Sequence, residues 1–283
     1  MTGTRHLETD LGYVAYETRG QGEPAVLFWH SLFATRRMWQ AQADDLARDH
    51  RVVLIDGPGH GDSSEPERPF TLEDCARVAT RVLDVCEVER AVWVGLSWGG
   101  MVAMRSALHH PERVLALGLF DTNAEAEPPL VQLRNRAMAA VYRHFGFHPL
   151  IAEKVRELMF GKSTLARDPH AGDDILEHVR SRDRQGMLRA IEAVVLERRS
   201  ILDELHRVQV PALVVVGEED LAAPPPFAER IAAALPHARL ERIPACGHLS
   251  ALEAPETVTG LIRELLSGAS SDPSTLSTPS TSP

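Results

Sequence analysis

The stretch VWVGLSWGG, residues 92–100, decides the fold that the sequence predicts. It begins with an apolar run rich in β-branched residues, which is typical of a buried strand. The residues that follow, MVAMRSAL at 101–108, have the pattern of a helix, so we expect a strand, a sharp turn and a helix, with Ser97 at the turn. Such a turn strains the backbone of the serine. Gly95 and Gly99 suit it, because a side chain at either position would clash.

This turn has a chemical use. It holds the hydroxyl of Ser97 clear of the sheet, and it lets the backbone N–H of Trp98, at the start of the helix, face a developing negative charge. A G-x-S-x-G pattern also occurs by chance. The hypothesis of a nucleophilic serine therefore depends on finding a base and an acid elsewhere in the chain.

Length, charge and cysteine content limit the class of protein. The 283 residues suit one large α/β domain or two small ones. The formal net charge of −10 argues against a nucleic-acid partner, because phosphate binding needs a basic surface. Three cysteines form neither a disulfide framework nor a zinc-binding spacing, and no apolar run is long enough to span a membrane. With no apolar stretch near the N-terminus to indicate a signal peptide, we expect a cytoplasmic protein without a membrane partner.

Apolar runs alternate with helical stretches along much of the chain. Strands are expected at residues 12–17, 25–29, 51–55, 92–96, 114–120, 211–217 and 238–243. Helices are expected at residues 38–48, 71–87, 101–108, 227–235 and 255–266. The first strand has the alternating pattern of a sheet edge. The alternation of strands and helices is typical of an α/β fold, a mostly parallel sheet with helices on both faces.

The alternation is interrupted once, and the interruption defines the expected domains. Residues 122–207 have a charged, helical pattern with proline breaks, which predicts an inserted helical cap. The core then consists of residues 1–121 and 208–266. Residues 267–283 are rich in Ser, Thr and Pro and lack core residues, so we expect a disordered tail.

A serine hydroxyl is a poor nucleophile at neutral pH and needs a base and an orienting acid. His248 is the favoured base, because it lies in a glycine-containing loop directly after the last predicted strand. Asp220 follows the preceding strand and is the favoured acid, in the chain order Ser, Asp, His. His30 is the alternative base and Asp121 the alternative acid, since both also follow predicted strands. Asp56 precedes the nucleophile and is expected to brace its own glycine-rich loop.

Two N–H donors are needed to stabilise an oxyanion during ester cleavage. We expect one from Trp98 and the other from Leu32, which lies in the loop after the strand at 25–29. The side chains of Phe33, Trp98 and Leu249 are expected to contact the substrate in a largely apolar pocket under the cap. The mechanism needs no metal and no organic cofactor, so none is expected.

These residues resemble the α/β-hydrolase superfamily over nearly the whole chain. The resemblance is carried by the turn at Ser97, the loop at His30, the pattern Asp56-x-x-Gly59-x-Gly61-x-Ser63, the pattern Gly217-x-x-Asp220, and the pair Gly247-His248. It implies an eight-stranded, mostly parallel sheet with helices on both faces, an inserted helical cap and a Ser–Asp–His triad.

Three stretches also look like the 3-oxoadipate enol-lactonase group. They are HSLFATRRMW at 30–39, GLSWGGM at 95–101 and HLSALEAPE at 248–256. This likeness implies ring opening of a small lactone or hydrolysis of a small ester. The sequence departs from the pattern at Ser31, where most of the superfamily has glycine, and at Trp98, where methionine is expected.

The sequence therefore predicts a serine hydrolase that cleaves a carboxylic ester or lactone, with this small molecule as its partner. The same triad could instead catalyse one of two other reactions, the hydrolysis of a carbon–carbon bond or perhydrolysis. An alternative of another class is a non-catalytic ligand-binding protein on a hydrolase frame, and the sequence is compatible with a homodimer. If the substrate carries a carboxylate, the candidate cations are Arg37, Arg134 and Arg136.

Overall fold

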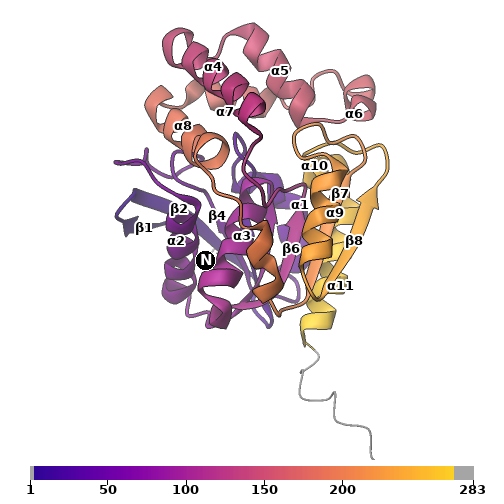
Figure 1. Ribbon diagram of the computed structural model, residues 1–283. Helices are drawn as coiled ribbons and strands as arrows, with labels where there is room; N and C mark the ends of the chain where they lie inside the picture. Colours follow the sequence, from indigo (N-terminus) through magenta and orange to yellow (C-terminus); the bar gives the residue numbers. More distant parts are fainter. Residues whose placement is uncertain (1–2, 271–283) are drawn as a thin grey trace, which may run out of the picture.

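The computed structural model describes residues 3–270 and has an eight-stranded sheet below a layer of helices (Figure 1). The strand order is β1-β2-β4-β3-β5-β6-β7-β8. The β1·β2 and β2·β4 pairs are antiparallel, and all other neighbours in the sheet are parallel. The strands are β1 (Arg5–Thr9), β2 (Gly12–Arg19), β3 (Ala25–Trp29), β4 (Val52–Ile55), β5 (Ala91–Leu96), β6 (Val114–Phe120), β7 (Ala212–Gly217) and β8 (Ala238–Ile243). The expected α/β fold is confirmed.

The central strands are apolar along their whole length because both faces of the sheet are covered. In β3, Leu27 and Trp29 pack in the hydrophobic core on one face, and Val26 and Phe28 pack in the core on the other. Side chains of successive strand residues point to opposite faces, so a continuous apolar run fills two cores at once. This explains why the apolar runs of the sequence predicted these strands well.

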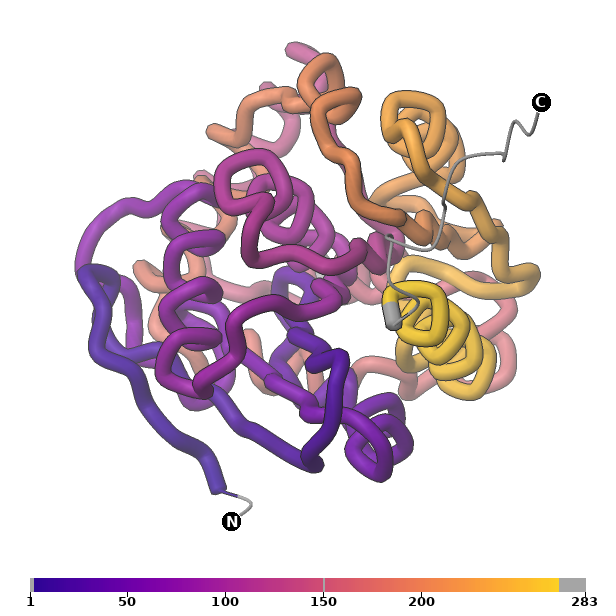
Figure 2. Tube along the Cα trace, turned by 90° about the horizontal axis from the view of Figure 1, so that it is seen from below, coloured from indigo at the N-terminus to yellow at the C-terminus, as the bar shows by residue number. Residues whose placement is uncertain are grey.

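Two sets of helices cover the two faces. On one face lie α2 (Leu72–Val85), α3 (Trp98–His109) and α9 (Pro225–Ala234), and on the other lie α1 (Gln40–Leu46) and α11 (Pro255–Ser270). Figure 2 shows α11 beside α1, where Arg263 Nε donates to Asp45 Oδ1 at 2.6 Å. Shorter helices connect these elements: η1 (Arg36–Trp39), η2 (Pro111–Arg113), η4 (Leu202–Arg207) and α10 (Ser250–Glu253).

The chain between β6 and β7 forms the helical layer seen at the top of Figure 1. Its elements are α4 (Pro129–Phe145), α5 (Pro149–Met159), α6 (Lys162–Arg167), α7 (Asp173–Ser181), α8 (Arg184–Ile191) and the π-helix η3 (Glu192–Leu196). We call this layer the cap. In residues 3–270 no helix combines the length and the apolar character that crossing a membrane requires.

The two ends of the chain differ from the sequence expectation. Strand β1 was not predicted, because an edge strand pairs on one side only and most of its side chains are exposed. Consequently β2, expected at the sheet edge, lies between β1 and β4. Helix α11 continues to Ser270, so residues 267–270 are helical rather than part of a disordered tail. The rest of the expected tail, 271–283, lies outside the described residues.

Candidate active site

Ser97 lies at the sharp turn between β5 and α3, in the middle of the sheet. Its backbone has φ 54° and ψ −109°, a combination that residues other than glycine rarely adopt. The Ser97 N–H donates to the Phe120 carbonyl at 2.8 Å, and the Thr122 hydroxyl donates to the Ser97 carbonyl at 2.7 Å. These bonds fix both sides of the turn, so the surrounding fold maintains the strained serine.

The two glycines around Ser97 allow close packing of the helix on the sheet. A Cβ atom at Gly95 would lie 2.0 Å from the carbonyl carbon of Gly99, and one at Gly99 would lie 2.1 Å from the carbonyl oxygen of Trp29. Both distances are far shorter than any real van der Waals contact. The structure therefore agrees with the steric role expected of both glycines.

His248 and Asp220 form a buried hydrogen-bonded pair at the ends of neighbouring strands. His248 Nδ1 and Asp220 Oδ2 are 2.8 Å apart, and the two side chains are 2% and 0% exposed. The other oxygen of Asp220, Oδ1, accepts the N–H groups of Ala222 and Ala223, each at 2.8 Å. Because an ionised carboxylate can only accept, Nδ1 of His248 carries the hydrogen and Nε2 keeps a lone pair.

The charge of Asp220 changes the acid–base behaviour of His248. Burial on its own lowers the pKa of the ring, because a charged imidazolium is poorly solvated there. The attraction and the hydrogen bond of Asp220 outweigh burial and raise the pKa of His248 above the ordinary value of 6.5. Asp220 thus stabilises the protonated ring, as an orienting acid must.

The alternative acid, Asp121, is engaged elsewhere. Its Oδ1 accepts the Gly217 N–H at 2.8 Å, and its Oδ2 accepts the hydroxyl of Ser250. Burial, followed by repulsion from Asp220, raises the pKa of Asp121 well above its ordinary value. The structure therefore brings Asp220, rather than Asp121, into hydrogen-bond contact with the ring of His248.

The alternative base, His30, has both ring nitrogens in use. Its Nε2 accepts the N–H of Gly57 at 2.8 Å, and its Nδ1 donates to the carbonyl of Ser31 at 2.7 Å. No lone pair remains to take a proton from a serine hydroxyl. Burial also lowers the pKa of His30, so the ring is neutral and structural.

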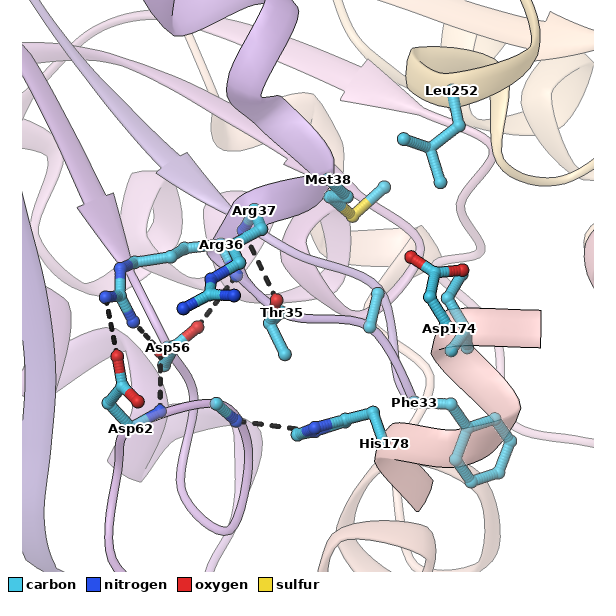
Figure 3. Close-up of a pocket in the computed structure, with 13 residues that line it drawn as sticks. Phe33, Thr35, Arg36, Arg37, Met38, Asp56, Asp62, Asp174, His178 and Leu252 are labelled. Carbon is cyan, nitrogen blue, oxygen red and sulfur yellow. Dashed lines mark hydrogen bonds and ion pairs between the residues drawn. The ribbon is translucent and has the colours of Figure 1, made fainter. Parts of the chain in front are cut away.

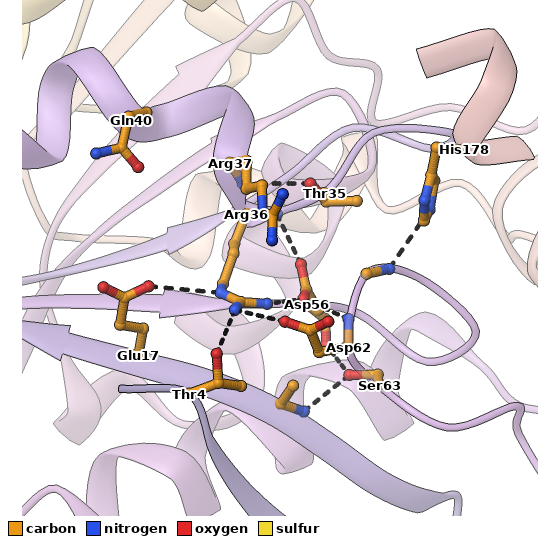
Figure 4. Close-up of polar contacts among 12 residues, drawn as sticks. Thr4, Glu17, Thr35, Arg36, Arg37, Gln40, Asp56, Asp62, Ser63 and His178 are labelled. Carbon is orange, nitrogen blue, oxygen red and sulfur yellow. Dashed lines mark hydrogen bonds and ion pairs between the residues drawn. The ribbon is translucent and has the colours of Figure 1, made fainter. Parts of the chain in front are cut away.

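Asp56 stabilises its glycine-rich loop, as expected (Figure 4). Its Oδ1 accepts the backbone N–H of Arg36 at 2.7 Å, and its Oδ2 accepts that of Asp62 at 2.9 Å. The guanidinium of Arg36 pairs with the same carboxylate, and the Ser63 hydroxyl donates to the Asp56 carbonyl at 2.7 Å. These bonds fix the loop from residue 56 to residue 63.

A cavity of about 390 Å³ lies between the cap and the ends of the strands. Ser97 and His248 both line it, together with Leu32 and Phe33 from the loop after β3. The backbone N–H groups of Leu32 and Trp98 donate no hydrogen bond within the part of the chain that the structure describes. Both groups are therefore free to bind an oxyanion.

Most of the cavity wall comes from the cap, which agrees with the apolar pocket expected there, but the wall residues themselves were not predicted. The wall is mainly apolar and includes Val131, Met138, Tyr142, Phe147, Ile151, Val155, Leu158, Met159, Ile191, Val194 and Val195. An amphipathic pattern shows which face of a helix is apolar. Residues that line the cavity and residues that pack in the core both lie on that face, so no sequence signal separates them.

Among the candidate cations, Arg134 lies on the wall, Arg136 pairs with Glu197 at 2.9 Å, and Arg37 lines a separate pocket.

Two side chains expected at the substrate lie elsewhere, which corrects the expectation. Trp98 is fully buried, and its ring packs against Trp29, His30 and His60 with centroids 5.2–5.4 Å away. Leu249 is also fully buried, in the core beside α11. Neither lines the cavity. Each of them directly follows a candidate site residue, Ser97 or His248, but its own side chain points into the core.

Comparisons with known proteins identify the family. The family model for the alpha/beta hydrolase fold matches residues 24–255, and the chain therefore belongs to the α/β-hydrolase family.

Similar proteins extend this result along almost the whole chain. 3-Oxoadipate enol-lactonase 2 of Acinetobacter baylyi is 26% identical over 253 residues, 89% of this chain and 92% of the relative. The structure of a thermophilic esterase from Thermogutta terrifontis matches with a TM-score of 0.85 and 30% identity, covering 94% of this chain and 99% of that one. The structure of the enol-lactonase from Burkholderia xenovorans matches with a TM-score of 0.82 and 28% identity, covering 90% and 96%. The resemblance to the superfamily and to enol-lactonases is confirmed, and the chain is an α/β-hydrolase enzyme.

Proposed function

We propose that this enzyme is a serine hydrolase that cleaves a carboxylic ester or lactone through an acyl-enzyme on Ser97. One observation carries the proposal. The cavity is lined by both Ser97 and His248, and His248 is bonded to a buried carboxylate through Nδ1, so that Nε2 keeps its lone pair. The names of the similar enzymes, esterase and enol-lactonase, support the same class of reaction.

The mechanism begins with proton transfer from Ser97 to His248 Nε2. The serine oxygen attacks the substrate carbonyl, while Asp220 holds the ring and stabilises the imidazolium. The N–H groups of Leu32 and Trp98 donate to the oxyanion of the tetrahedral intermediate. Among the described residues the Ser97 hydroxyl has no hydrogen-bond partner, which fits a contact that shortens when substrate binds.

The second half of the mechanism releases the acyl group. The imidazolium of His248 gives its proton to the leaving alkoxide, and the acyl group remains bonded to Ser97. With a lactone substrate the alkoxide stays attached to the acyl group. A water molecule then loses a proton to His248 and attacks the acyl carbonyl, which forms a second tetrahedral intermediate. When the bond to the serine oxygen breaks, the acid is released and His248 returns the proton to Ser97.

The cavity favours a small, largely apolar substrate. Its wall is mainly aliphatic and aromatic, and its volume of about 390 Å³ suits a short acyl chain or a small ring. Arg134 on the wall supports a substrate with a carboxylate beyond the reacting carbonyl. Arg198, also on the wall, is paired with Glu127 and is not available for this purpose.

A substrate panel tests the proposed reaction. We expect the enzyme to hydrolyse short p-nitrophenyl esters, small lactones or both well above the rate in buffer, and the ratio of the two rates separates esterase from lactonase. If Ser97 reacts with a fluorophosphonate but neither substrate is cleaved, carbon–carbon hydrolysis or perhydrolysis replaces the proposal. If the protein binds these ligands tightly but is neither labelled nor active, it is a non-catalytic binding protein.

The raised pKa of His248 predicts the pH dependence of the reaction. The ring accepts the serine proton only when it is neutral, so kcat/KM should fall as the pH drops through the pKa of His248. Because Asp220 raises this pKa, the midpoint should lie above 6.5. The measurement is kcat/KM on the preferred ester from about pH 5 to about pH 9. A profile without an acidic limb would contradict the role of His248 as base.

A further inference from the structure

The turn that contains Leu32 has an unfavourable backbone conformation. The Ala34 N–H donates to the Ser31 carbonyl at 3.1 Å, which closes a β-turn with Leu32 and Phe33 at its centre. Phe33 is the third residue of this turn and has φ 71°. At this position of a β-turn, a positive φ is normally found with glycine. Without an outside contact, the turn would favour a negative φ at Phe33. That change would rotate the peptide between Leu32 and Phe33, directly beside the Leu32 N–H.

His60 supplies the outside contact. Its Nε2 accepts the Phe33 N–H at 3.3 Å, and its Nδ1 donates to the Pro58 carbonyl at 3.0 Å. The side chain is fully buried, and this burial, which disfavours the charged ring, lowers the pKa of His60 well below its ordinary value. The ring is therefore neutral, and Nε2 keeps the lone pair that the Phe33 N–H requires.

The loop that carries His60 is held from two sides. On the core side, the carboxylate of Asp56 bonds the loop and Arg36 as described above (Figure 4). On the cap side, His178 Nε2 accepts the Gly61 N–H at 3.4 Å (Figure 3), and Arg182 donates to the Gly61 carbonyl at 3.0 Å. The loop is therefore fixed on both sides, and it holds the ring of His60 in the position that its hydrogen bond to the Phe33 N–H requires.

We propose that His60 is a positioning residue for the oxyanion hole. By holding the Phe33 N–H, its Nε2 maintains the turn in which the Leu32 N–H faces the substrate carbonyl oxygen. His60 does not line the cavity and touches no reacting atom. The inference rests on the proposed function, because the oxyanion exists only if Ser97 attacks a carbonyl. Since the negative charge develops in the transition state, losing this support should lower kcat more than it changes KM.

Three substitutions of His60 separate positioning from folding. His60→Asn keeps a donor near Nδ1 for the Pro58 carbonyl but has no acceptor at the position of Nε2. His60→Gln places a carbonyl oxygen near the position of Nε2, and His60→Leu removes both polar groups. We expect His60→Asn to lower kcat about 10- to 100-fold with KM changed less than about threefold, and His60→Gln to recover most of the loss. His60→Leu should lose at least as much activity as His60→Asn.

A matched control and a second readout complete the experiment. His50→Leu removes a histidine that is bonded to the Pro24 carbonyl away from the cavity, and it should keep the full kcat. A boronic acid that forms a tetrahedral adduct on Ser97 should bind His60→Asn more weakly by the same factor as the loss in kcat. Binding of the alcohol product should not change.

The outcomes distinguish this inference from the proposed function. If His60→Asn keeps the kcat of the natural enzyme, the inference is overturned. If His60→Gln and His60→Asn have the same melting temperature and the same low kcat, the acceptor at Nε2 is not what matters, and the inference is again overturned. If Ser97→Ala remains active, the proposed function fails and this inference fails with it. If Ser97→Ala is inactive and His60→Asn is fully active, the inference about His60 is overturned and the proposed function stands.

Discussion

Replacing Ser97 with alanine is expected to lower kcat by about 10⁵- to 10⁶-fold, the scale of loss when the nucleophile of a serine triad is removed. The substitution deletes the attacking oxygen, and neither the oxyanion donors nor His248 can replace it. The fold should remain intact, because the bonds that fix this turn use the backbone of Ser97 rather than its hydroxyl. The measurement is kcat on the preferred ester, with a melting temperature within about 2 °C of the natural enzyme.

Ser106 provides the matched control for this substitution. It lies on the same helix, α3, and its hydroxyl donates to the Val102 carbonyl at 3.0 Å, within the core. Ser106→Ala should therefore keep nearly the full kcat. If Ser97→Ala retained activity within about tenfold of the natural enzyme, the role of Ser97 as nucleophile would be contradicted.

The second large effect is expected for Asp220→Asn, which should lower kcat about 10⁴-fold. The geometry around the carboxylate gives the reason. Oδ1 accepts the N–H groups of Ala222 and Ala223, so the amide oxygen of an asparagine would take that position. Its NH₂ group would then point at Nδ1 of His248 and force the ring hydrogen onto Nε2. The ring could no longer accept the proton of Ser97.

Asp121→Asn is the matched control for the acid. Its amide oxygen can keep accepting the Gly217 N–H, and the residue makes no hydrogen bond to His248. We expect kcat to stay within about tenfold of the natural enzyme. Comparing kcat of the two asparagine variants on one ester decides between the carboxylates. Equal losses, or a larger loss in Asp121→Asn, would contradict the assignment of Asp220 as the orienting acid.

Much of the fold follows from local sequence, because the central strands must be apolar on both faces. The runs at β3, β5 and β6 therefore stand out clearly. The turn at Ser97 could also be predicted, because its serine and two glycines lie together in the sequence, although the hydrogen bonds that fix it come from Phe120 and Thr122. β1 could not be predicted in this way. It is a short, mostly exposed edge strand whose stability depends on pairing with β2.

Candidate site residues could be predicted where their backbone position decides their role. Ser97, Asp220 and His248 follow strands of the sheet, and the structure places the last two in contact. The direction of a side chain is harder to predict, which explains why Trp98 was expected in the cavity but packs in the core. His60 lies between the two glycines of the pattern Gly59-x-Gly61. Its bond to Phe33 connects residues 27 positions apart, so only the folded chain reveals it.

Labelling with a fluorophosphonate, followed by mass spectrometry of the intact protein and its peptides, tests the central claim most directly. We predict one phosphonyl group per chain, located on Ser97, with no labelling of Ser97→Ala and much slower labelling of Asp220→Asn. The reagent reacts only with a serine that has an active base beside it, so this result would establish the nucleophile independently of the substrate. No adduct, or an adduct on another residue such as Ser31 or Ser250, would contradict the account.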